Sequence, residues 1–268
     1  MVTLKTRAEI LKMRHAGFLV WKAHQLVESL IRPGITTREL DAAVEEFFVS
    51  QGAEGLFKGV PGRVPYPAVT CISVNEEVVH GIPGSRVIQE GDIVSIDTGC
   101  RWEGWCGDAA ATYPVGTVEP EKMRLLRVTK SALDLAIELL PKRKYWSEVA
   151  AAMQQYVQKE GFAVVEAFVG HGIGRKMHEE PQVPNFVNAR FVQSGDFRLQ
   201  PGLVIAIEPM VNMGTRNVRL KRDFWTQVTA DGRASAHFEH TVALTEKGAY
   251  VLTGPACPMD AEMGFVAG

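Results

Sequence analysis

The chain has 268 residues, of which 46% are hydrophobic and 22% charged, a balance typical of globular proteins that excludes disordered, collagenous and coiled-coil chains. Its 29 Lys and Arg and 31 Asp and Glu give a net charge of −2, so no bulk basic field is available for nucleic acid or anionic lipid. No apolar run approaches the ~20 residues of a membrane span, and the N-terminus lacks the apolar stretch of a secretory signal. The four cysteines indicate reduced thiols in a cytoplasmic protein.

The first half of the chain is expected to consist of two helices followed by strands. The motifs Thr6-Arg-Ala-Glu9 and Thr36-Thr-Arg-Glu39 have the form of capping boxes, in which a hydroxyl and a carboxylate bind free amides of the first helical turn. Apolar residues at helical spacing continue behind each box, up to Arg32-Pro33-Gly34 and to Gly52. Further along we predict a loop over 53–68, a strand over 69–74, and a hairpin with arms 93–97 and 108–113 that turns around 101–104.

The second half repeats the order of helices and then strands. We predict helices from about 119 to 140, before Pro141, and over 147–160, before Gly161. Strands are predicted over 163–169, 203–211, 218–230 and 235–244. No linker separates the halves, so we expect a single α+β catalytic domain over 1–268, with helices packed on a mainly antiparallel sheet. Its halves are expected at about 1–135 and 136–250, followed by a C-terminal tail over 251–268.

Asp97 and Asp108 form the first candidate site. A hairpin centred between Trp102 and Glu103 would place them directly opposite each other, where two carboxylates repel. A bound divalent cation would offset both charges, and carboxylate oxygens are suitable hard ligands. The alternative is a pair near the turn that points into water.

Two further carboxylates lie in largely apolar strands. Glu208 interrupts the apolar run 203–211, where a charge is unfavourable unless it is paired or bound to metal. Strand alternation places Glu239, His237 and Thr241 on one face. The alternatives are that Glu208 faces solvent on an alternating strand and that the polar face around Glu239 is solvated.

Three histidines stand next to glycines, prolines or strand ends. His171 lies in Gly170-His-Gly-Ile-Gly174, whose glycines let the backbone approach a ligand closely, and His178 follows in His-Glu-Glu-Pro. The spacing matches neither the dinucleotide-binding nor the zincin motif. His80 lies on a tight turn over 79–83. Each histidine alone is also compatible with a hydrogen-bonded structural or surface residue.

Together these residues favour a two-metal hydrolase. Two divalent ions need about four negative ligands for neutrality, and Asp97, Asp108, Glu208 and Glu239 supply that number, with a nitrogen from His171. Two metals ~3.5–4 Å apart activate a water for attack on a polarised carbonyl.

The motifs, in this order and at this spacing, resemble those of methionine aminopeptidases of type I from residue 5 to about 247. The segments that carry the resemblance are 9–17, 32–37, 71–75, 80–83, 91–94, 107–108, 170–174, 178–183, 207–211 and 238–241. The resemblance implies the pita-bread fold, with two αβ halves related by a pseudo-twofold axis. The 30 residues from His178 to Glu208 and the 31 from Glu208 to Glu239 leave no room for the insertion of type II enzymes, so the bacterial short form is implied.

The resemblance also implies roles for individual residues. Metal ligands are implied at Asp97, Asp108, His171, Glu208 and Glu239. Catalytic roles are implied for His80, His178 and Glu208, and substrate contacts for His80, His178, Tyr66, Cys71, Met177 and Trp225. The implied cofactors are two divalent ions (Co, Mn, Fe or Zn) and a monovalent cation near Asn75 and Ser235. The implied partners of this cytoplasmic monomer are N-termini of nascent or newly made proteins and, transiently, the ribosome, with no membrane.

The sequence departs from the family pattern at four positions. Ala109 stands where the family usually has Thr, which removes a hydroxyl expected beside the ligands. Met177 replaces an aromatic residue of the methionine pocket, and Val60 and Arg63 stand where Cys and Tyr are frequent. These changes are expected to affect the shape of the pocket and the rate rather than the reaction.

Two rival functions are weighed against this expectation. Xaa-Pro dipeptidases and aminopeptidases resemble the same catalytic half but usually add a large N-terminal domain, and only 68 residues precede the strand predicted at 69. A non-catalytic relative that binds proteins or RNA would be expected to have lost ligands, and all five are present.

Overall fold

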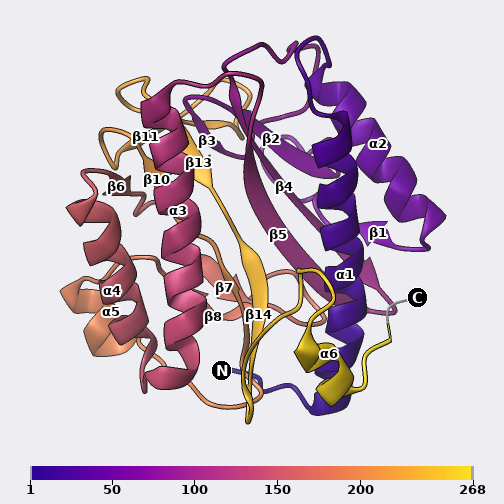
Figure 1. Cartoon of the computed structure of the whole chain (residues 1–268), viewed down its shortest axis with the longest axis vertical. Coiled ribbons are helices and arrows are strands. Elements are labelled where there is room, and N and C mark those ends of the chain that lie inside the picture. The colour runs from indigo at the N-terminus through magenta and orange to yellow at the C-terminus, as the bar shows by residue number, and fades with distance from the viewer. Residues whose placement is uncertain (1, 267–268) are drawn as a thin grey trace.

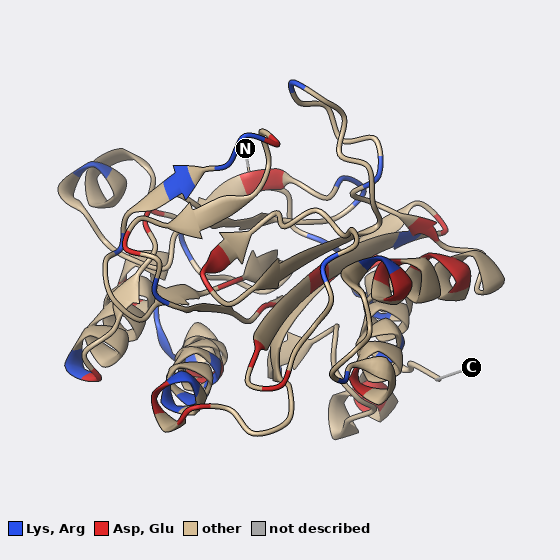
Figure 2. Cartoon of the chain, turned by 90° about the horizontal axis from the view of Figure 1, so that it is seen from above, with Lys and Arg blue, Asp and Glu red and all other residues tan. Residues whose placement is uncertain are grey.

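Helices on the outside of the molecule cover antiparallel sheets in its middle (Figure 1). The structure is a computed structural model that describes residues 2–266. The expected α+β fold, with two αβ halves and antiparallel strand pairing, is confirmed. Figure 2 shows both signs of charge mixed along the outer helices and acidic segments on strands in the centre. Among the described residues, no helix is long and apolar enough to cross a membrane.

The two capping boxes open the first two helices as predicted. In α1 (Arg7–Leu30) the Glu9 carboxylate accepts the Thr6 N–H at 2.8 Å, and in α2 (Thr37–Ser50) Glu39 accepts the Thr36 N–H at 2.8 Å. Helix α1 packs directly on the first sheet because two glycines meet there. An ideal Cβ at Gly107 would lie 2.8 Å from the Gly17 Cα, so a side chain here would push the helix away.

The first sheet contains a hairpin that is longer than predicted. It consists of β4 (Ile93–Trp102) and β5 (Trp105–Pro114), with β2 (Thr70–Val74) and the short β1 (Glu54–Gly55) on the other side of β4. The expectation that Asp97 faces Asp108 is wrong: Asp97 pairs with Ala110, and Asp108 pairs with Gly99. The turn lies at Glu103 and Gly104, both with positive φ (47° and 79°), as a two-residue hairpin turn of this kind requires.

The second half contains the other two long helices and the largest sheet. The predicted helices are α3 (Pro120–Leu139), followed by a turn of 3₁₀-helix (Leu140–Lys142), and α4 (Trp146–Lys159). The sheet has the order β15-β14-β9-β7-β8. Its strands are β7 (Gly170–Gly172), β8 (Glu179–Val183), β9 (Val204–Ile207), β14 (His240–Thr245) and β15 (Gly248–Val251).

Four predicted strands are broken or shortened. The run 203–211 stops at Glu208-Pro209 and resumes as β10 (Met210–Asn212), and 235–244 is divided at Phe238-Glu239 into β13 (Ser235–His237) and β14. Each break lets the chain change partners, because β9 pairs with β7 and β14 while β10 pairs with β13 and β6 (Ala163–Val164). The run 218–230 is a hairpin of β11 (Val218–Leu220) and β12 (Gln227–Thr229), and of 163–169 only β6 is a strand.

Several short elements were not predicted. Four are strands of the sheets described above: β1, which lies within the loop predicted over 53–68, and β7, β8 and β15. The others are β3 (Glu77–Val79), which pairs with β12, α5 (Ala189–Ser194) and α6 (Pro258–Met263). Helix α6 lies in the expected C-terminal tail and is held by Arg14 of α1, whose buried guanidinium binds Asp260 at 2.8 Å.

Candidate active site

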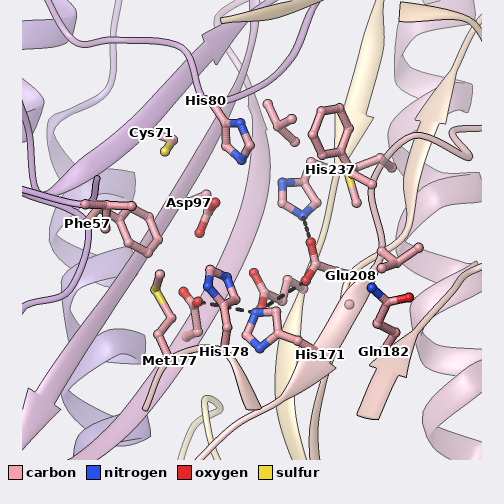
Figure 3. A pocket seen from close by; sticks show the side chains of 18 of the residues that line it. Phe57, Cys71, His80, Asp97, His171, Met177, His178, Gln182, Glu208 and His237 are labelled. Atoms are coloured by element: carbon pink, nitrogen blue, oxygen red, sulfur yellow. Dashed lines mark ion pairs between the residues drawn. The ribbon is translucent and has the colours of Figure 1, made fainter. Parts of the chain in front are cut away.

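A cavity of about 620 Å³ lies between the two halves, and all eleven predicted site residues line it (Figure 3). They come from β2, β4 and β5 in the first half, from β7 and the breaks after β9 and β13 in the second, and from loops that cover the opening. The residues therefore meet at the seam between the halves. Their individual roles remain predictions.

Two carboxylates of the site are separated by a small side chain. Asp97 on β4 pairs with Ala110 on β5, and on the other side of Ala110 the Glu239 N–H donates to the Ala110 carbonyl at 2.8 Å. Neighbouring strands lie about 4.8 Å apart, so the two carboxylates flank Ala110 in one row.

Asp108 has room for its carboxylate because its cross-strand neighbour is a glycine. Gly99 pairs with Asp108, and an ideal Cβ at Gly99 would lie only 2.8 Å from Asp108 Oδ1. Any side chain at this position would therefore displace the carboxylate.

Substitution of Gly99 by alanine is expected to weaken divalent-metal binding by about tenfold, the lower end of the effect of disturbing a ligand's surroundings. The measurement is the Kd for Mn²⁺ by isothermal titration calorimetry. Gly84→Ala is the matched control, because a Cβ at Gly84 meets nothing closer than 4.0 Å and its φ is not positive. Unchanged Kd in Gly99→Ala would show that the Asp108 carboxylate does not depend on this space.

His171 presents one ring nitrogen to the carboxylates. With the Nδ1 hydrogen donated to the Gly172 carbonyl at 3.0 Å, Nε2 faces Glu208 Oε1 at 3.6 Å and Asp108 Oδ2 at 4.0 Å. Asp108, His171 and Glu239 each offer one ligand atom, and these three atoms lie within 4.8 Å of one another. A backbone acceptor on the other nitrogen is the usual way in which a metal-binding imidazole is oriented.

The electrostatics of the site fit bound cations. Burial, together with the neighbouring carboxylates, raises the pKa of Asp97, Glu208 and Glu239 well above the usual range, and burial raises the pKa of Asp108 to about 7. Within residues 2–266, one oxygen each of Asp97, Asp108 and Glu239 is buried without a hydrogen-bond partner. Divalent ions would supply the missing partners and offset the charge, so the donor set fits a two-metal centre.

His80 and His178 both line the cavity with the carboxylates (Figure 3). His80 has a left-handed backbone (φ 60°), and its ring stands edge-on to Phe168 at 5.4 Å and to Trp225 at 6.3 Å. His178 is exposed at the cavity edge, with its ring 4.3 Å from that of His171. Burial lowers the pKa of both rings, that of His80 to about 4, so each is a neutral imidazole with one N–H to donate.

An apolar pocket adjoins the carboxylates. Tyr66 is fixed in its wall by hydrogen bonds from its hydroxyl to the carbonyls of Thr70 (3.0 Å) and Gly81 (2.9 Å), and its ring stands edge-on to Trp225. Cys71 and Met177 complete the predicted set. Val60 also lines the cavity, whereas Arg63 stacks on Phe224 at 4.0 Å and does not reach it.

The sequence analysis missed several lining residues. His237 faces the cavity with its Nε2 3.9 Å from Glu208 Oε2, so Glu208 lies between His171 and His237 (Figure 3). Strand alternation had placed His237 on the same face as Glu239, and this pattern could have identified His237 as a lining residue. Phe57, Phe168 and Gln182 lie in loops or on β8 without any periodic signal.

The absent hydroxyl at Ala109 has a structural explanation. Ala109 faces the core beneath α1 and α2, on the opposite side of β5 from Asp108. Its carbonyl accepts a hydrogen bond from the buried His24 at 3.0 Å. A hydroxyl on this side chain would point away from the carboxylates in this structure.

Comparison with known proteins gives a consistent picture. Residues 11–246 match the metallopeptidase family M24. The methionine aminopeptidase 1 of Bacillus subtilis (strain 168) is 46% identical over 253 residues, 94% of this chain and 99% of the relative. A crystal structure of methionine aminopeptidase from Thermotoga maritima has a TM-score of 0.90 and 43% identity, covering 95% of this chain and 100% of that one. A prolidase from Pyrococcus furiosus, 24% identical over 95% of this chain and 66% of its own, shares the fold with a TM-score of 0.74.

Proposed function

The chain belongs to the metallopeptidase family M24, and we propose that it is a dinuclear metal-dependent aminopeptidase that removes the N-terminal methionine from newly made proteins. One observation carries the proposal: four carboxylates and His171 converge in a cavity that continues into an apolar pocket. The similarity to the methionine aminopeptidase of Bacillus subtilis over nearly the full length supports the same activity.

Each site residue has a defined task in this proposal. Asp97, Asp108, His171, Glu208 and Glu239 would hold the metal ions, which when bound activate a water and polarise the scissile carbonyl. Glu208, between His171 and His237, also receives and passes on a proton. Asp97, together with the metal ion that it would hold, would bind the free α-amine, which restricts cleavage to chain ends.

The two histidines act on the peptide itself. His178 donates a hydrogen bond to the carbonyl oxygen as negative charge develops there, and preorganised donors of this kind contribute ~3–4 kcal/mol. His80, between Phe168 and Trp225, steadies the amide nitrogen of the scissile bond. The substrate is thereby held between the metal ligands and the two rings.

The donor set restricts the metal to a class. Carboxylates with one imidazole suit Mn(II), Fe(II), Co(II) or Zn(II). We also propose a monovalent cation near Asn75 and Ser235, where the Asn75 carbonyl accepts the Ser235 N–H at 2.9 Å and the Ser235 hydroxyl donates to the Val211 carbonyl.

The proposed substrates determine where the protein works. N-termini of nascent chains are available in the cytoplasm, at the ribosome, so we propose cytoplasmic action with transient ribosome contact by a monomeric enzyme. Cross-linking to translating ribosomes and analytical ultracentrifugation test the two parts separately.

Specificity provides the direct test. Tyr66, Cys71, Met177 and Trp225 form a narrow apolar pocket, in which a thioether packs well against aromatic edges. We expect the highest kcat/KM for methionine, a moderately lower value for norleucine, and low values for leucine and alanine, with small second residues preferred.

A peptide panel varied at the first two positions measures this, with Met177→Phe as the matched variant. The stiffer ring is expected to lower the norleucine-to-methionine ratio of kcat/KM, because a pliant methionine adapts to either side chain. Equal rates for Met-Ala and Leu-Ala peptides, or a preference for Xaa-Pro, would contradict the methionine assignment.

A further inference from the structure

The edge of β5 lies beside residues 237–241 at the seam between the halves, and Figure 1 shows β5 and β14 side by side there. At one end of this contact, a single hydroxyl serves both backbone groups of a predicted metal ligand. The Asp108 N–H donates to Thr241 Oγ1 at 3.0 Å, and the same hydroxyl donates to the Asp108 carbonyl at 2.8 Å. Both residues are buried.

The same arrangement occurs in reverse at the other end. The His237 N–H donates to Thr112 Oγ1 at 2.9 Å, and Thr112 Oγ1 donates to the His237 carbonyl at 2.8 Å. Thr112 follows Asp108 by four residues, and Thr241 follows His237 by four. The two bridges are therefore reciprocal, as expected where two similar halves meet about a twofold axis.

Between the bridges, the backbones bond directly. The Glu239 N–H donates to the Ala110 carbonyl at 2.8 Å. The contacts 108–241, 110–239 and 112–237 form an antiparallel register in which a threonine hydroxyl replaces the direct backbone bonds at each end. Asp108 and Glu239, which carry ligand atoms within 4.8 Å of each other and of His171, extend from this short ribbon.

The hydroxyls are specifically required for this geometry. A hydroxyl has one hydrogen to donate and two lone pairs, so it can bind an N–H and a C=O of the same residue at once. An isosteric valine can do neither. It would leave a buried N–H and C=O unpaired, and the strands would have to shift to recover partners.

We propose that Thr241 and Thr112 are positioning residues that set the separation of the two ligand-bearing strands, with Thr241 placing Asp108 against Glu239 for metal binding. The expected effect on metal binding rests on the proposed metal-dependent function. The hydrogen bonds of the two bridges involve protein atoms alone. Neither threonine lines the cavity, so neither is expected to touch substrate.

The test compares Thr241→Val and Thr112→Val, which remove the hydroxyl, with Thr241→Ser and Thr112→Ser, which keep it. We expect Thr241→Val to raise the Kd for Mn²⁺ by about 10- to 100-fold, the range for partners that orient metal ligands, and Thr241→Ser to stay within about threefold. Thr129→Val is the matched control. Its side chain is equally buried, and its hydroxyl donates at 2.8 Å to the Leu125 carbonyl within α3 rather than to a backbone group of a ligand-bearing strand. It is expected to keep the wild-type Kd.

A second readout needs no metal. In the metal-free protein, the Asp108 amide is expected to exchange its hydrogen faster in Thr241→Val and the His237 amide faster in Thr112→Val, each with little change at the other site. If Thr241→Val does not accumulate as a folded protein, the inference is tested with Thr112→Val by the same two measurements, the Kd for Mn²⁺ and amide hydrogen exchange.

Three results would overturn the inference: wild-type Mn²⁺ affinity in the folded valine variants, an equal loss in the serine variants, or an equal loss in Thr129→Val. Failure of the wild-type protein to bind metal would instead contradict the proposed function. In that case, faster amide exchange at Asp108 in Thr241→Val would still identify the bridge.

Discussion

Removal of divalent metal is expected to abolish peptide hydrolysis, and readdition of up to two ions per chain is expected to restore it. The reason is that Asp97, Asp108, Glu208 and Glu239 form a buried set of four carboxylates, of which three have an oxygen without a partner among the described residues. Without cations these groups have no partner for their charge. The measurement is the rate of Met-Ala cleavage in chelator-treated protein, followed by titration with Mn²⁺ and elemental analysis.

Stability provides a second readout that does not depend on turnover. Burial raises the pKa of Asp108 to about 7, and the pKa of its three neighbours is also raised, so these four groups bind more protons in the folded metal-free protein than in the unfolded chain. Their contribution to stability is therefore expected to fall as the pH rises from about 4 through 7. The buried histidines, whose pKa is lowered, act in the opposite direction below about pH 6.5, so the loss is measured above that pH. Bound Mn²⁺ is expected to raise the Tm and remove this loss. Full turnover in excess chelator, with metal shown to be absent, would falsify the two-metal assignment.

Substitution of His178 by alanine is expected to leave metal binding intact and to lower kcat by about 10²–10³-fold, the effect of losing one donor to a developing oxyanion. His178 is exposed at the cavity edge, and its ring stands edge-on to that of the predicted ligand His171. Its N–H is therefore free to reach a bound peptide. The measurements are kcat, KM and metal stoichiometry on the same preparation.

Two matched variants separate this role from others. His171→Ala is expected to lose metal and activity together, whereas His15→Ala, whose ring stacks on Trp102 outside the cavity, is expected to lose neither. If His178→Ala loses metal in proportion to activity, His178 is a ligand and its assignment as a donor to the carbonyl is wrong.

Local patterns in the sequence were sufficient for the four long helices, for the first hairpin apart from its register, and for a set of candidate site residues. The capping boxes at Thr6 and Thr36 act between residues three apart, so they predict helix starts without knowledge of the rest of the fold. The glycines beside His171 indicated a close approach of the backbone to a ligand. The carboxylates in apolar strands indicated positions where a charge needs a partner. The motifs then indicated the family, and the matched region and relatives confirm it.

Register and strand breaks depended on contacts that no local pattern contains. The hairpin turns at Glu103 and Gly104, one residue later than predicted. Both turn residues have positive φ, but only Gly104 is of a residue type that favours this conformation, so Glu103 gave no local signal for the position of the turn. The apolar runs around Glu208 and Glu239 were predicted to be continuous strands. Each is interrupted where the chain passes from one sheet to another. Such a break is decided by available partner strands rather than by propensity.

The sequence by itself determined the family and a set of candidate site residues. Only the tertiary structure decided how these residues are held. Thr112 and Thr241 lie 129 residues apart and have no unusual local context, and their hydroxyls become bridges only when the two halves meet. His237 joins the site for the same reason, and away from the site Arg14 of α1 binds Asp260 in the predicted tail. Hydrogen bonds between distant segments depend on atomic separation across the seam, and this separation is a property of the packed halves rather than of either segment.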